Sequence, residues 1–453
     1  MSELEQSQSS AEFKEKQALQ SDKPTKSLAE CISALSKFGG YQFVEGLVDG
    51  AQNLNPERKA RRNIFLTDPE KKSEKEALSK KIDIWLQLLS ENNGMDEMAD
   101  FASKKAEESS SLLKGNLKKI SEDCKELETS YRSVALFFQN AESDKINNLS
   151  VINASMDSLQ DLDGQFIRHV SEELKQNYDR LDLRDNYSLM CIPGYLGSNK
   201  VVSEWGRIAH QNKVMLVTDF DDLSDVNMTL DDYKDSKLTS GDIYKSNVVM
   251  TGNYLVGRGK NDEIGEEEDL MVPPSSSLAG RMYTTLMAQI SAGAKFGTLN
   301  AVDGVRFAMK KSEISEYDKN GLVPMVSEYG KVMAFSGKTL FSGDNLGLQT
   351  YSVVRVFDYI NKVLIDFLNR RAFENWTSIT EKNLREQIVK FLDGITGPQG
   401  LIEKFRIDRF ERDENQKDKI HLDIFLMPYF PAKSFMLKLD GTKGNFDTET
   451  KQV

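Results

Sequence analysis

The succession of segments between residues 187 and 220 constrains the fold most. "YSLMCIPGYLG" is typical of a buried strand that ends in a loop, "KVVSEWGRIAHQNK" of an amphipathic helix and "VMLVTDF" of a second buried strand. Strands joined through a helix pair in parallel, and the resulting sheet needs helices over its apolar faces. The sequence therefore predicts an α/β chain (mixed α+β) whose body consists of helix-covered mixed sheets.

The part of the chain before this body is first polar and then helical. Residues 1–26 are rich in Ser, Gln, Glu and Lys, so they bury little apolar surface. In the segment "SLAECISALSKFGG" that follows, Leu28, Ile32 and Leu35 have the spacing of one helical face. We expect a short amphipathic helix there, which either docks on its own domain or is recognised by another protein.

Two longer helices follow this segment. Ser73 and Glu76 form a capping pattern at the start of the first helix, "SEKEALSKKIDIWLQLLSENNG". The second is "CKELETSYRSVALFFQNAE", and the apolar residues on one of its sides are Leu127, Tyr131, Val134 and Phe138. At "NLSVINAS" the apolar period changes to two, which predicts a strand around residues 149–153.

The C-terminal part has an all-β pattern after Gly397 and Pro398. "EKFRIDRFERD" and "HLDIFLMPYFPAKSFMLKLDG" indicate strands that have no obvious sheet to join. They either complete a sheet of this chain or offer backbone groups to another one. We therefore expect four regions: a flexible segment with the short helix over 1–60, a helical region over 61–145, an α/β body over 146–396 and a C-terminal β region over 397–453.

Charge and cysteine content exclude several classes of protein. The formal net charge of the 453 residues is -12, which disfavours a nucleic-acid partner. The three cysteines lie far apart, which fits a reducing compartment better than a disulfide framework. No stretch has the ~18–20 apolar residues of a membrane span, and no apolar leader is visible near residue 1. We expect a cytoplasmic protein with no membrane insertion.

Motifs for catalysis are weak. "GKT" at residues 337–339 lacks the glycine of a phosphate-binding loop, because Val332 occupies that position. His169, His210 and His421 are isolated from one another and from cysteine, so a metal site is not expected. There is no GxSxG elbow for a serine nucleophile. We therefore expect no catalytic residue, no metal and no cofactor, and a cytosolic α/β enzyme is the weaker hypothesis.

The order of the segments resembles the larger subunit of the type VI secretion contractile sheath, the TssC/VipB-like family. "ELETSYRSVALFFQNAE" followed by "INNLSVINASMDSLQDLDGQF" is similar to the start of that family's conserved body. "SLAGRMYTTLMAQISAGAKFGTLNAVDGVRF", the "GLVPM" step and the C-terminal "IFLMPYF" are similar to later segments. The resemblance covers roughly residues 70–440 and identifies a divergent branch, with Met427 and Tyr429 at the family's arginine and histidine positions.

This resemblance implies a structural role in a bacterial assembly. The implied partners are a small sheath subunit (TssB/VipA-like), other copies of the chain in a helical polymer, an inner tube protein, a baseplate and a recycling AAA+ ATPase. Contraction of the polymer would drive the inner tube out of the cell. A related phage-tail-like contractile injection particle, whose sheath usually needs one polypeptide, is the alternative.

The resemblance also implies three sets of site residues. The strands that pair between subunits would use Phe405, Ile407, Leu422, Ile424 and Leu426. The disassembly ATPase would recognise the helix that carries Leu28, Ile32 and Leu35. The helix "TEKNLREQIVKFLDG" would face the inner tube with Lys382, Arg385 and Lys390.

Overall fold

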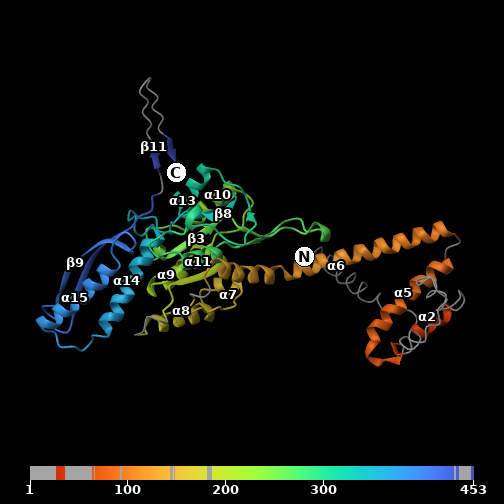
Figure 1. The fold of residues 1–453 in the computed structure, drawn as a ribbon, viewed down its shortest axis with the longest axis horizontal. Helices are drawn as coiled ribbons and strands as arrows, with labels where there is room; N and C mark the ends of the chain where they lie inside the picture. Colours follow the sequence, from red (N-terminus) through yellow and green to blue (C-terminus); the bar gives the residue numbers. More distant parts are fainter. Residues whose placement is uncertain are drawn as a thin grey trace, which may run out of the picture. The chain divides into compact units, whose positions relative to one another are not determined.

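The computed structural model describes residues 27–35, 64, 65, 67–91, 94–142, 146, 148–180, 186–432, 435–437 and 450–452 (Figure 1). The chain forms two compact units, Met1–Leu117 and Lys118–Val453. The four regions expected from the sequence stay predictions.

The N-terminal unit is helical. Cys31 is fully buried, and its Sγ lies 3.4 Å from Oγ of Ser79 in a later helix. Ile82 and Leu86 complete this small core, as their helical spacing predicts. The elements are α2 (Leu28–Leu35), the 3-10 turn η2 (Pro69–Lys71), α5 (Lys72–Glu91) and the first part of α6 (Met95–Asn140).

The predicted capping role of Ser73 and Glu76 is wrong, because the helical segment begins earlier. Asp68 accepts a hydrogen bond from the backbone N–H of Glu70 at 2.9 Å and caps η2, which continues directly into α5. Pro69 favours this start, since proline fits the first position of a helix and lacks the N–H that would be unsatisfied there.

The second unit is built around a five-stranded sheet with the order β1-β2-β3-β7-β8. The first four strands are parallel, and β8 is antiparallel to β7. This mixed, helix-covered sheet confirms the predicted fold class. Its strands are β1 (Leu189–Tyr195), β2 (Met215–Asp219), β3 (Val248–Gly252), β7 (Leu322–Glu328) and β8 (Lys331–Ala334).

Helices cover both faces of this sheet, because successive residues of each strand point to opposite sides. In β2, Leu216 packs into one core while Met215 and Val217 pack into the other. The first core also takes residues from α8 (Gln165–Tyr178), α9 (Asn199–Gln211), α10 (Val226–Ser236) and α13 (Lys311–Asn320). The second core takes residues from α11 (Ser275–Thr284) and α14 (Tyr351–Asn369).

Smaller elements complete the body. The three-stranded sheet β5-β4-β6 consists of β4 (Leu255–Arg258), β5 (Leu270–Val272) and β6 (Gly304–Val305). The short helices are α7 (Met156–Gln160), α12 (Gly293–Phe296), η5 (Ile243–Asn247) and η6 (Asp262–Ile264). The strand predicted around residues 149–153 is absent from the structure, where Val151 and Ile152 are exposed and belong to no ladder.

The C-terminal part of this unit has a core of its own. Side chains from α14 and α15 (Ser378–Gly394) pack against β9 (Ile402–Arg412) and β10 (Ile420–Pro428). These two strands form an antiparallel sheet, as the all-β pattern predicts (Figure 1). Two short strands, β11 (Phe435–Leu437) and β12 (Thr450–Gln452), pair further along the chain.

Candidate functional site

The β9–β10 sheet has one apolar face that is fixed by direct cross-strand pairs. Leu422 lies opposite Phe410, and Ile424 lies opposite Ile407. Leu426 forms a third pair with Phe405. All five residues predicted for strand pairing therefore lie on the face that packs against α14 and α15. Sequence analysis did not include Phe410, which is 3% exposed and anchors the set.

The other face of the β9–β10 sheet is open. Arg406 lies opposite Phe425, and its guanidinium is 5.2 Å from the centre of the phenyl ring. Phe425 is 51% exposed and Met427 is 44% exposed. A large apolar side chain left in water costs free energy unless something else covers it. This face is therefore suited to a contact outside the described chain.

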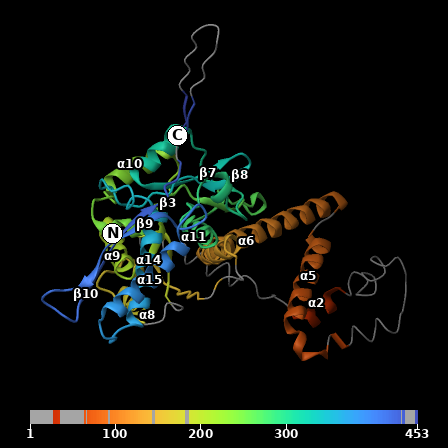
Figure 2. The same cartoon turned by 60° about the vertical axis from the view of Figure 1, so that its left-hand side comes forward.

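The outer edges of β9 and β10 are also open. Within the described residues these strands form a ladder only with each other, apart from a single bridge between Thr396 and Ile402 (Figure 2). Long edge strands leave a row of backbone N–H and C=O groups that an added strand can use. At the end of β10, the Tyr429 hydroxyl donates to the carbonyl of Gly397 at 2.6 Å and fixes that end of the sheet.

The turn between β9 and β10 is held by side chains. Nε2 of His421 lies 2.7 Å from Oδ2 of Asp413. Asp413 also accepts hydrogen bonds from the backbone N–H groups of Asn415 and Gln416. The hydrogen bond with His421, together with these N–H groups, holds the pKa of Asp413 well below its ordinary value. The charged connection is thus a structured turn, and it keeps both strands in register.

The three predicted residues of α15 do not form one surface. Lys382 and Lys390 are exposed. Arg385 instead donates to the carbonyl of Phe410 at 3.2 Å, and its guanidinium lies 5.5 Å from the centre of the Phe410 ring. In this structure Arg385 holds α15 against the β9–β10 sheet. An inner-tube contact of this helix stays a prediction.

The helix predicted for ATPase recognition packs within its own unit. Ile32 is partly buried against the core formed by Cys31, Ile82 and Leu86. The side chains of Leu28 and Leu35 lie outside the described residues. The docked state that the sequence left open is the one present in this structure, and the recognition role stays a prediction.

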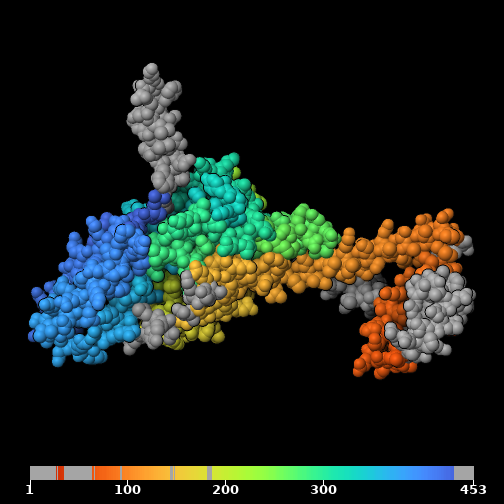
Figure 3. Space-filling model, in the orientation of Figure 1, coloured from red at the N-terminus to blue at the C-terminus, as the bar shows by residue number. Residues whose placement is uncertain are grey.

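The C-terminal half of α6 exposes a row of apolar residues. Leu127 is 73% exposed, Tyr131 is 71% exposed, and Val134 and Phe138 are each 41% exposed. The sequence placed these residues on one side of the helix, and the structure shows that this side faces solvent. The orange atoms of α6 reach the molecular surface in the space-filling view (Figure 3). Sequence analysis missed this surface as a candidate site.

A buried carboxylate closes one end of the main sheet. Asp219 at the end of β2 accepts hydrogen bonds from Gly194 N–H and Ser275 N–H, each at 2.8 Å, and from the Ser275 and Thr251 hydroxyls. Burial raises its pKa to about 6 despite these donors. The group joins β1, β2, β3 and α11, and all its oxygens are engaged, so it is suited to holding the sheet together.

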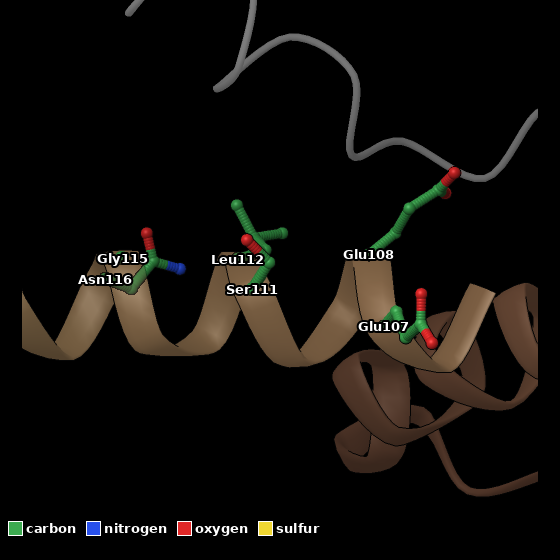
Figure 4. A pocket seen from close by; sticks show the side chains of 6 residues that line it. All are labelled: Glu107, Glu108, Ser111, Leu112, Gly115 and Asn116. Atoms are coloured by element: carbon green, nitrogen blue, oxygen red, sulfur yellow. The ribbon is translucent and has the colours of Figure 1, made fainter. Parts of the chain in front are cut away.

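Chemical sites are otherwise scarce in the part of the chain that the structure describes. No cluster of three His, Cys, Asp or Glu side chains is placed to hold a metal ion there. A depression on α6 is lined by six residues of this one helix, so it is an open surface rather than a cleft (Figure 4). Among the described helices, none is both long and apolar enough to span a membrane.

Three family models match successive parts of the chain. The TssC/VipB-like N-terminal region matches residues 28–117, and the type VI secretion system TssC/VipB central domain matches residues 119–342. The TssC/VipB-like C-terminal domain matches residues 350–452. The chain belongs to the TssC/VipB family. It is therefore a contractile-sheath subunit, as the order of its segments predicted.

Solved structures with a similar fold include other contractile particles. The anti-feeding prophage (AFP) helical sheath in its contracted state is 16% identical, with a TM-score of 0.49, and the match covers 69% of this chain and 82% of that one. A chain of the AFP baseplate is 16% identical, with a TM-score of 0.47, and covers 68% and 79%. The PVC sheath complex of an extracellular contractile injection system, also contracted, is 14% identical, with a TM-score of 0.41, and covers 54% and 68%. A comparison with curated proteins gave no match.

The TssC/VipB segments agree with the structural units. The N-terminal match ends at residue 117, where the first compact unit also ends. The central match contains the five-stranded sheet, and the C-terminal match contains α14, α15 and the β9–β10 sheet. The TssC/VipB C-terminal segment therefore carries the sheet whose edges and outer face are open.

Proposed function

We propose that this chain is the large subunit of a bacterial type VI secretion sheath, which pairs with a small sheath subunit in the cytoplasm. Together they form a helical tube around an inner tube and contract to drive it out of the cell. One observation carries the proposal: the β9–β10 sheet is anchored on one face and open at both edges and on the other face. Its role is structural, not catalytic.

Strand exchange explains why such an open sheet is useful. Subunits of a contracting tube must rotate past one another without separating, and a strand donated through a flexible linker permits that rotation. Each added backbone hydrogen bond contributes only about 0.5–1.5 kcal/mol net. Many such strands act together along a helical polymer, so the assembly is strong although each strand binds weakly.

The anchored inner face supplies the rigidity that a strand acceptor needs. Cross-strand apolar pairs fix the register of β9 and β10 before any guest arrives. Arg385 and the Tyr429 hydroxyl further fix the sheet to its surroundings. The guest strand then meets a pre-organised edge, so the acceptor sheet loses little entropy on binding.

The other partners follow from the same role. The inner tube would lie against α15, where Lys382 and Lys390 are exposed, and a baseplate would start the polymer. A recycling AAA+ ATPase would act on α2 once that helix leaves its place on α5. A phage-tail-like injection particle is the second candidate, and a sheath that assembles without a small subunit would favour it.

The test is co-expression with the small-subunit gene, followed by negative-stain microscopy for hollow tubes. Successive N–H groups of a strand point to opposite edges, so one of Ile424→Pro and Phe425→Pro removes a donor from the outer edge of β10. We expect the proline variant that lacks the outer-edge N–H to form no tubes. Its thermal unfolding should stay close to that of the parent chain. Ile424→Val is the matched control and should form tubes. Normal tubes from both proline variants would overturn the proposal.

A further inference from the structure

One side of α14 is polar although it faces the interior of the protein. Its residues follow one another at intervals of four, three and four: Tyr351, Arg355, Asp358 and Lys362. We call this row the α14 stripe. Tyr351, Arg355 and Lys362 are buried, and the side chain of Asp358 is 15% exposed. Buried polar and charged groups are costly unless each has a fixed partner, so the partners of this row matter.

The second half of the α14 stripe contacts the starts of three neighbouring strands. The Asp358 carboxylate accepts a hydrogen bond at 2.8 Å from the side-chain amide of Asn247, the residue directly before β3. It also lies 3.7 Å from Nζ of Lys213, two residues before β2. Nζ of Lys362 donates at 2.7 Å to the carbonyl of Tyr187, two residues before β1. The helix therefore crosses the amino end of the parallel strands β3, β2 and β1.

Asn247 connects Asp358 to the sheet itself. Its side-chain amide also donates to the carbonyl of Val214 at 3.2 Å, and its Oδ1 lies 2.7 Å from Nδ1 of His210. Because the nitrogen of this amide donates twice, its oxygen is the acceptor and His210 carries a proton on Nδ1. Asn247 is fully buried with all its polar atoms engaged, so the place of Asp358 is set by β2, β3 and α9.

The first half of the α14 stripe holds the segment around the end of α11. Arg355 donates to the carbonyl of Met282 at 3.0 Å, and a cation is favourable near the C-terminus of a helix. The Tyr351 hydroxyl accepts a hydrogen bond from the backbone N–H of Ser291 at 2.7 Å. All four members of the stripe thus bond to groups outside α14.

The opposite side of α14 supports the β9–β10 sheet. Val356 and Ile360 are buried in the same core as Phe410 of β9. Figure 1 shows α14 next to α15 and β9. One helix therefore has the central sheet on its polar side and the β9–β10 sheet on its apolar side. Apolar contacts have no direction, whereas hydrogen bonds need a defined distance and angle, so the polar side fixes the rotation of the helix about its axis.

We propose that the α14 stripe sets the orientation of the β9–β10 sheet relative to the central sheet, so that the two sheets turn as one body. Resting on the proposed function, this orientation directs the open edges of β9 and β10 toward the neighbouring subunit, and a rotation imposed there reaches the central sheet through α14. A buried ion pair can often be replaced by apolar side chains of similar volume without loss of stability. A role in orientation can therefore be separated from a role in stability.

The first experiment measures the distance between two spin labels on the full chain by double electron–electron resonance. The labels are attached through Lys404→Cys on the outer face of β9 and Asp231→Cys on α10, both at exposed positions, in a chain that also carries Cys124→Ser. Cys31 is buried, and burial raises the pKa of Cys191 to about 12, so neither should react. We expect one narrow distance distribution. A broad or two-peaked distribution would overturn the proposal.

Two matched double variants then test the stripe itself. Asp358→Leu with Lys362→Met removes its acid and its lysine, which lie four residues apart. Asp366→Leu with Arg370→Met removes another acid and base four residues apart at the end of α14, which pair with each other at 3.1 Å. Measured well below the thermal midpoint of each variant, the distance distribution should be at least twice as wide for the first pair and unchanged for the second.

An unchanged width in the Asp358→Leu with Lys362→Met variant would overturn the proposal. If that variant does not fold, Lys362→Met alone carries the same test, because it leaves Asp358 and its bond to Asn247 in place and removes only the contact with β1.

Co-expression with the small-subunit gene tests the consequence for assembly. We expect at least fivefold fewer tubes from the stripe variant than from the parent, and parental numbers from the Asp366→Leu with Arg370→Met control. Normal tubes from a stripe variant with a broad distance distribution would overturn the role in assembly. A parent chain that forms no tubes would refute the proposed function, while the orientation measured on the isolated chain would stand.

Discussion

The five-stranded sheet and the β9–β10 sheet differ in how completely the chain covers them. Helices pack on both faces of the first, and Leu216, Val217 and Val249 in its centre are fully buried. The second packs on helices with one face, and Phe425 on its other face is half exposed. The first sheet is complete within one chain, and the second offers edges and a face that another chain can complete.

This difference separates residues that fold the subunit from residues that assemble it. A substitution inside the five-stranded sheet acts on the isolated chain, because all the contacts are internal. A substitution on the outer side of the β9–β10 sheet should act mainly on the polymer.

The largest effect is expected from the same substitution made in both sheets. Leu216→Ala removes a fully buried side chain, so we expect the free energy of unfolding to fall by about 2–5 kcal/mol. Leu426→Ala, at a partly buried position, should cost less than about 2 kcal/mol in the isolated chain. Denaturant titration of both variants checks this. Equal losses would mean that the β9–β10 sheet is as completely packed as the central one.

The sequence predicted the central sheet because its strands are apolar on both sides. Leu216 and Val217 both had to be buried, whichever way the strand was turned. The β9–β10 sheet was also predictable, since alternation separates Leu422, Ile424 and Leu426 from Phe425. In the first case both sides are apolar, and in the second the alternation shows which side is apolar.

The exposed apolar row on α6, formed by Leu127, Tyr131, Val134 and Phe138, could not be placed in the same way. The side of α6 that packs on the body carries Ser133, Leu136 and Asn140, and Gly280 lets α11 approach this side closely. The more apolar side is the exposed one. Helical spacing identifies an apolar side but not the chain that covers it. The prediction of a strand at residues 149–153 failed for a related reason. A period of two needs a neighbouring strand, and the described residues provide none there.

A second prediction concerns pH and the end of the central sheet. The ordinary pKa of Asp219 is 3.8, and burial raises it to about 6 in the folded chain. The folded state therefore holds this proton more tightly than the unfolded state between these values. The stability from this group is fully present below pH 3.8 and is lost as pH rises through 6, by about 2–3 kcal/mol in all.

Asp219→Asn removes this titration and also leaves buried N–H and O–H donors competing for one carbonyl oxygen. We expect the variant to be less stable than the parent, with an unfolding free energy that changes less between pH 4 and 7. Parallel denaturant titrations across this range provide the measurement. A parent and variant with the same pH dependence would show that Asp219 does not titrate there. Under conditions where the parent and the Asp219→Asn variant are both folded, we expect them to form tubes equally well.

The smallest effect is expected at the turn of the β9–β10 sheet. His421→Ala removes the hydrogen bond to Asp413 but no core side chain, so thermal unfolding of the body should not change. The two strands should open more often, because His421 fixes the turn that sets their register. Amide hydrogen exchange should therefore become several-fold faster in residues 403–412 and 420–427 alone. If exchange also accelerates in the central sheet, the two sheets unfold as one unit, and the separation between folding and assembly surfaces fails.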